Sequence, residues 1–150
     1  QFDVRDLNEI FELRKALELA AVEKVSATIS KNEAQKLESV LKEQRASAEQ
    51  KDMIRFLECD RQFHTLLTAL TNNKRLVESL ENIRDLLQVM SAFALSIEDR
   101  LWEVIQEHEA VLEAVGAQAS DLAREKMGQH LEESRKKTET GMLQSIKNTG

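Results

Sequence analysis

The chain has 150 residues and a formal net charge of −6. Binding of nucleic-acid phosphates needs clustered lysine and arginine, so we do not expect this acidic segment to hold DNA by itself. It contains no proline, four glycines and one cysteine, which excludes an internal disulfide and favours helix over sheet. No signal peptide and no apolar run of about 18 residues is present, which predicts a soluble cytoplasmic protein without a membrane partner.

Hydrophobic periodicity and capping residues predict an all-α fold, an antiparallel bundle of about six helices. The length fits one domain over residues 1–150. The last residues, from about 144 to 150, are expected to fray. The predicted helices cover about residues 4–29, 31–48, 52–70, 74–95, 98–115 and 120 into the 140s. Either Ser30 or Asn32 could cap the second of them, which then begins at residue 31 or 33.

Polar residues interrupt the apolar stripe of the third predicted helix. Met53, Leu57, Asp60, His64 and Leu67 follow one another in steps of four and three residues and therefore share one face. A buried polar group without a partner costs roughly 1–3 kcal/mol. This helix is therefore expected to bury an acid and an imidazole that need partners.

The other two histidines also lie within apolar stripes. His108 is near the centre of the stripe on the fifth predicted helix, and His130 shares a face with Met127 and Leu131 on the sixth. Any one of the three could be a core imidazole bonded to a backbone carbonyl. All three together, with Asp60 one turn before His64, favour a shared divalent ion such as Zn²⁺, Ni²⁺, Mn²⁺ or Fe²⁺.

An arginine also interrupts the stripe of the first predicted helix. Arg14 lies between Ile10 and Leu17, and Glu18 follows it by one turn. Arg14 could form a structural ion pair with Glu18. Alternatively, its planar guanidinium could receive the carboxylate of a small molecule whose other end reaches the metal. Periodicity alone leaves both interpretations open.

Several enzymatic motifs are absent. A di-iron bundle needs Glu-x-x-His on two helices, but Arg61, Ile105 and Met127 occupy the positions three residues before the histidines. The zinc-protease motif HExxH, a glycine-rich phosphate loop and a GxSxG elbow are also missing. A mononuclear metal hydrolase or lyase remains an alternative, but the stripes offer no spare carboxylate to act as its general base.

The chain resembles the FCD domain, the C-terminal effector-binding and dimerisation domain of FadR-type regulators in the GntR family. The resemblance covers nearly the whole chain and rests on four segments in order. These are Leu7-x3-Phe11-Glu12-Leu13-Arg14-x3-Glu18, Asp60-x2-Phe63-His64-x2-Leu67, Glu107-His108-x3-Leu112-x-Ala114 and Asp121-x-Ala123-x3-Met127-x2-His130-Leu131.

The resemblance implies a metal site and an effector site. In the metal-binding branch of the family, an Asp and three His hold the ion, which correspond here to Asp60, His64, His108 and His130. Arg14 is the implied contact of a carboxylate effector. Arg84 is a possible second one, although an exposed surface arginine is the alternative.

We therefore predict the effector-sensing domain of a transcriptional regulator and not an enzyme. Its expected partners are a small organic acid, a second copy of the chain, and operator DNA only through a winged helix-turn-helix that this segment lacks. Val89, Met90 and Phe93 are candidate exposed apolar residues for the dimer. The remaining alternative is a purely structural helical dimerisation module.

Overall fold

The computed structural model describes residues 2–97 and 99–150, and these residues form seven α-helices and no strand. The predicted all-α class is confirmed. Among these residues, no helix is long and apolar enough to cross a bilayer. The helices are α1 (Val4–Thr28), α2 (Lys31–Glu49), α3 (Met53–Ala69), α4 (Lys74–Glu81), α5 (Arg84–Ala94), α6 (Arg100–Gly116) and α7 (Ser120–Thr149).

Side-chain caps explain where several helices begin. Ser30 caps α2 in a reciprocal capping box with Glu33, so the first of the two predicted caps is the one used. Asp52 accepts the backbone N–H of Arg55 at the start of α3, and Asn73 caps α4 in the same way. Each such cap satisfies amides that have no partner inside the helix.

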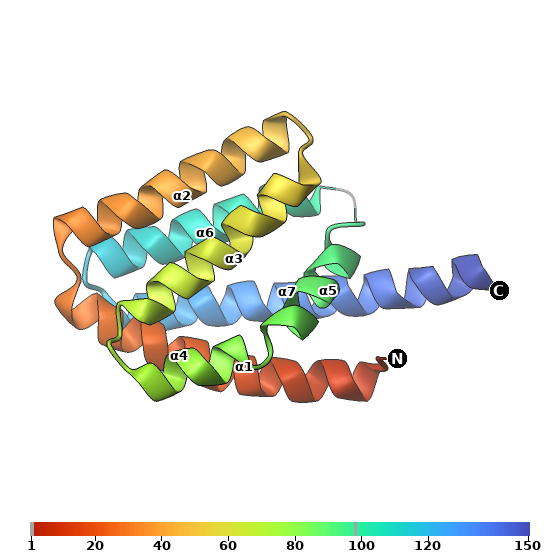
Figure 1. Ribbon diagram of the computed structural model, residues 1–150, viewed down its shortest axis with the longest axis horizontal. Helices are drawn as coiled ribbons and strands as arrows, with labels where there is room; N and C mark the ends of the chain where they lie inside the picture. Colours follow the sequence, from red (N-terminus) through yellow and green to blue (C-terminus); the bar gives the residue numbers. More distant parts are fainter. Residues whose placement is uncertain (1, 98) are drawn as a thin grey trace.

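The predicted fourth helix is broken into α4 and α5. The break is at Ile83, where φ is −108° and ψ is 3°. Leu80 and Ile83 belong to the same apolar cluster as Ala21 in α1, whereas Met90 clusters with Leu7 near the start of α1. The segment therefore serves two separate apolar clusters, and Figure 1 shows α4 and α5 running in different directions.

Two smaller predictions were also wrong. Helix α7 continues to Thr149, so residues 144–149 are helical and not frayed. Met90 is only 1% exposed and belongs to the core, whereas Val89 beside it is 47% exposed. The predicted start of the fifth helix at Glu98 lies outside the described residues, and α6 begins at Arg100.

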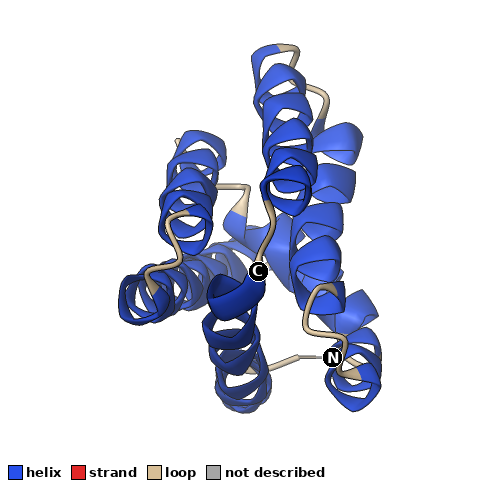
Figure 2. Ribbon diagram, turned by 90° about the vertical axis from the view of Figure 1, so that its left-hand side faces the viewer, coloured by secondary structure: helices blue, strands red, loops and turns tan. Residues whose placement is uncertain are grey.

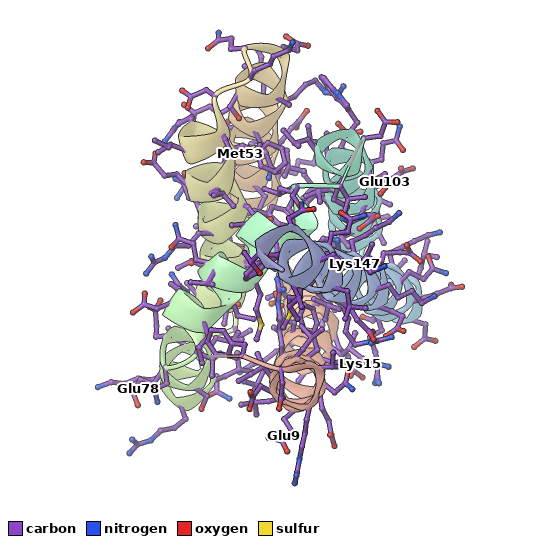
Figure 3. The ribbon with its side chains drawn as sticks, turned by 90° about the vertical axis from the view of Figure 1, so that its right-hand side faces the viewer. Glu9, Lys15, Met53, Glu78, Glu103 and Lys147 are labelled. Carbon is purple, nitrogen blue, oxygen red and sulfur yellow. The ribbon has the colours of Figure 1, made fainter. Side chains whose placement is uncertain are left out.

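The helices pack as a mainly antiparallel bundle around α7. Helix α7 contacts α1, α5 and α6, while α2 contacts α3 and α6. Figure 1 shows α1 and α7 running in opposite directions, and Figure 2 shows that the connections between the helices are short. Charged side chains such as Glu9 and Glu78 project outward in Figure 3. The main apolar core is built from α1, α2, α3, α6 and α7, and its Phe63 packs against the ring of His108.

Two glycines of α7 provide a matched test of this packing. A Cβ at Gly141 would lie 2.2 Å from the backbone oxygen of Phe93, whereas one at Gly128 would meet only the Leu19 side chain at 3.9 Å. We expect Gly141→Ala to destabilise the fold by at least about 2 kcal/mol because α5 must move away. Gly128→Ala should instead stabilise it by about 0.5–1 kcal/mol.

Chemical denaturation of both variants, with unfolding followed by circular dichroism, measures the difference. Equal free energies of unfolding for the two variants would contradict the close crossing of α5 and α7.

Candidate metal centre

The three histidines converge from three different helices. One ligand atom each of His64 in α3, His108 in α6 and His130 in α7 lie within 4.8 Å of one another. His108 is fully buried and His130 is 2% exposed, while the side chain of His64 is 11% exposed. The structure thus brings together residues that are far apart in the sequence.

Each imidazole is held at its Nδ1 atom by a different side chain. His64 Nδ1 contacts Glu18 Oε1, His108 Nδ1 lies 2.9 Å from Gln44 Oε1, and His130 Nδ1 lies 2.7 Å from Glu107 Oε1. An amide oxygen and ionised carboxylates can only accept hydrogen bonds, so each Nδ1 carries a proton and donates it. In a neutral imidazole the lone pair is then on Nε2.

The protonation states support this arrangement. Burial would raise the pKa of Glu18, but its contacts with His64 and Arg14 outweigh burial and hold the pKa well below its usual value. Glu107 also has a lowered pKa, because hydrogen bonds from His130 and Arg100 outweigh its burial. Burial lowers the pKa of His108 strongly and that of His130 as well. Both carboxylates are therefore ionised at neutral pH, and both of these imidazoles are neutral.

Asp60 lies beside the three histidines, one turn before His64. Its Oδ1 atom lies 3.4 Å from His108 Nε2 and 4.0 Å from His64 Nε2, and its side chain is 19% exposed. His108 Nε2 is buried and has no hydrogen-bond partner in the described part of the chain. Phe63 stacks on the ring of His108 at a centroid distance of 4.4 Å and restricts its orientation. A buried lone pair without a donor is costly, which points to a missing partner at this position.

A divalent metal ion fits this set of donors. Three imidazoles and one carboxylate suit Zn²⁺, Ni²⁺, Mn²⁺ or Fe²⁺. Two nitrogens that each bind an ion at about 2.1 Å can be at most about 4.2 Å apart. The observed spread of up to 4.8 Å is therefore close to what coordination needs. Asp60, His64, His108 and His130 are the residues that could hold the ion.

Arg14 lies beside this cluster and is 6% exposed. Its Nε atom donates to Glu18 Oε2 at 2.5 Å, so the ion pair considered from the sequence is present. Its Nη2 atom also lies 3.4 Å from His64 Nε2. Glu18 therefore connects Arg14 to His64, and Arg14 is a buried part of the same hydrogen-bonded cluster.

Two small cavities adjoin the cluster, and Arg14 and Asp60 line both of them. The larger cavity has a volume of about 50 Å³, and the smaller one, which His130 and Arg100 also line, has about 20 Å³. Arg84 lines the larger cavity, its side chain is 14% exposed, and it pairs with Glu81 at 2.7 Å. Arg84 is therefore largely buried and not an exposed surface arginine, and the larger cavity is lined by Arg14, Arg61 and Arg84.

A fully buried arginine supports the opposite side of the cluster. Both terminal nitrogens of Arg100 contact the Glu107 carboxylate, at 2.7 and 3.0 Å, and Nη2 also donates to Ser134 Oγ at 2.9 Å. Glu107 in turn holds His130. This chain of contacts fixes the ring of His130 and balances the charge of the buried carboxylate.

Periodicity singled out the histidines but missed the roles of Gln44, Glu107 and Arg100. Gln44 is fully buried on the inward face of α2, near Leu41 and Ala48. Like the histidines, Gln44 is a polar residue within an apolar stripe, and this signal could have identified it. Glu107 and Arg100 have no comparable signal, because their roles depend on where α7 packs against α6.

Residues 9–133 match the family model described as the FCD domain. The HTH-type transcriptional repressor RspR of Escherichia coli (strain K12) is 28% identical over 124 residues, which cover 81% of this chain and 53% of RspR. The chain therefore spans about half the length of this curated relative.

Two solved structures have a similar fold. The metal-free FCD domain of TM0439 has a TM-score of 0.78 and 19% identity, with 96% of this chain and 99% of that one covered. E. coli McbR/YncC has a TM-score of 0.79 and 21% identity, with 88% of this chain and 67% of that one covered. The curated relatives are named as transcriptional regulators and not as enzymes. Since the family model matches most of its length, the chain belongs to the FCD domain family.

Proposed function

We propose that this domain senses a small carboxylate effector through a divalent metal ion held by Asp60, His64, His108 and His130. The observation that carries the proposal is the fixed direction of the imidazoles. Each Nδ1 is engaged by an acceptor, and none of the residues that the structure describes forms a hydrogen bond with the buried Nε2 of His108. A metal ion bound there acts as a Lewis acid that attracts an anionic oxygen ligand.

The charges around the cluster favour an anion as that ligand. Glu18 and Glu107 are matched by Arg14 and Arg100, so their charges are largely balanced. A divalent ion exceeds the single negative charge of Asp60, and further arginines line the larger cavity. A cavity of about 50 Å³ has room for a few water molecules or the polar end of a small acid. Arg14 and Arg84 are the residues we assign to the carboxylate.

In the parent protein, we infer that effector binding changes how the domain pairs with a second copy and positions a separate DNA-binding domain on its operator. The ligands come from α3, α6 and α7, and Arg14 comes from α1. An effector held by the metal ion, Arg14 and Arg84 is linked to these four helices and to α5. It can therefore favour one packing arrangement over another, with a typical coupling of about 1–3 kcal/mol.

A thermal-shift screen of small carboxylates tests this function. We expect Zn²⁺-loaded wild-type protein to be stabilised by at least one mono- or dicarboxylate, because a ligand that binds only the folded state raises the melting temperature. Arg14→Ala and Arg84→Gln should reduce that shift. Arg75→Gln, which removes an arginine of α4 whose side chain is 89% exposed, should leave it unchanged.

The screen has clear contrary outcomes. Shifts that are the same in the wild type and in both cavity variants would contradict the assignment of the arginines. Unchanged stability when a chelator removes the metal would favour the structural dimerisation module. Turnover of an organic acid would revive the hydrolase or lyase alternative.

A further inference from the structure

Arg14 and the proposed metal ion need the same atom. The guanidinium Nη2 of Arg14 lies 3.4 Å from His64 Nε2. Because Nδ1 of His64 is engaged by Glu18, Nε2 is the atom with the free lone pair. This lone pair cannot accept a hydrogen bond from Arg14 and bind an ion at the same time.

Charge adds to this competition. A guanidinium is always protonated, and at hydrogen-bond distance from a ligand atom it repels an incoming divalent cation. Among the described residues, Arg14 forms its ion pair with Glu18 through Nε, whereas Nη2 is the end of the guanidinium that faces His64 Nε2. In the absence of metal, the guanidinium of Arg14 therefore supplies part of the positive charge that a bound metal ion would supply beside His64 Nε2.

Arg14 also has space to move without losing its anchor. Its Nε atom is held by Glu18 Oε2, while its side chain lines both cavities beside the cluster. A rotation of the outer guanidinium could release His64 Nε2 and turn the terminal N–H groups toward either cavity. In that position they can donate two parallel hydrogen bonds to a carboxylate.

We propose that Arg14 couples the two ligands: it contacts His64 Nε2 in the metal-free domain, and metal binding displaces it into position to hold a carboxylate. This proposal rests on the proposed function and describes how effector binding at that site is regulated by the metal ion. Metal and carboxylate then strengthen each other's binding by the same factor, because the coupling is reciprocal. An arginine that acted only as an effector contact would leave metal affinity unchanged in the absence of effector.

Calorimetric titration of the metal-stripped chain with Zn²⁺ tests the proposal, in carboxylate-free buffer and again with succinate as the probe. Without succinate, we expect Arg14→Gln to bind Zn²⁺ about 5-fold more tightly than wild type, or more, because a competing cation is gone. Succinate should strengthen Zn²⁺ binding to wild type and not to the variant. Arg75→Gln, which removes the exposed arginine of α4, should bind Zn²⁺ like wild type with and without succinate.

The outcomes separate this proposal from the function on which it rests. Equal or weaker Zn²⁺ binding by Arg14→Gln, with normal binding by wild type, overturns the coupling and leaves the metal site intact. Failure of wild type to bind Zn²⁺ overturns both. If Arg14→Gln does not fold, wild type alone tests the proposal. The affinity of wild type for succinate is then expected to be higher in the Zn²⁺-loaded chain than in the stripped chain. Equal affinities overturn it.

Discussion

Replacement of His108 by alanine is expected to reduce the affinity of the chain for Zn²⁺ by more than about 100-fold. Loss of a residue that only supports a metal ligand typically costs 10–100-fold, and His108 is itself a proposed ligand. Its Nε2 atom is buried, and no group of residues 2–97 and 99–150 forms a hydrogen bond with it. Calorimetric titration measures the affinity, and circular dichroism checks that the variant remains helical.

The matched control is Cys59→Ala. Cys59 is fully buried in the main core and is the only thiol of the chain. It directly precedes Asp60 in the sequence, so its thiol is an alternative metal ligand that the control must exclude. Zn²⁺ binding by Cys59→Ala should equal that of wild type. Tight binding retained in His108→Ala, or lost in Cys59→Ala, would contradict the proposed ligand set.

Replacement of Arg100 by methionine is expected to destabilise the domain by about 3 kcal/mol, because removal of one partner from a buried ion pair leaves the other charge uncompensated. Arg100 is fully buried, and the Glu107 side chain is 21% exposed, so water compensates only part of the loss. In a domain of this size, such a change lowers the melting temperature by roughly 6–12 °C. Thermal unfolding of the metal-free chain measures it.

Arg124→Met serves as the control for Arg100→Met. Arg124 pairs with Glu23 at 3.0 Å, but both side chains are about half exposed. Exposed pairs contribute about 0–1 kcal/mol, so the control should unfold almost like wild type. The double variant Arg100→Met with Glu107→Gln should be less destabilised than the sum of its parts. Additive losses would show that Arg100 and Glu107 act independently.

Most of the helices could be predicted from local sequence, because caps and periodicity are local properties. Ser30, Asp52 and Asn73 each cap a helix close to its predicted start. The break at Ile83 could not be predicted in this way. No proline or glycine interrupts residues 74–95, and the break depends on where α1 and α7 lie beneath them.

The same distinction applies to the candidate site. The histidines and Arg14 stand out in the sequence because each is a polar residue within an apolar stripe. The acceptors that orient the imidazoles come from three different helices, α1, α2 and α6. Only the packing of these helices shows that Glu18 serves both Arg14 and His64. The contact of Arg14 with His64 Nε2 also has no counterpart in the sequence pattern.

The most direct test of the metal centre is elemental analysis of the purified chain after incubation with Zn²⁺ or Ni²⁺ and removal of unbound ions. The donor set of Asp60, His64, His108 and His130 predicts one ion per chain. It also predicts that most of this ion is lost in His108→Ala. Less than about a tenth of an ion per wild-type chain with either metal, from protein that is folded, would contradict the account.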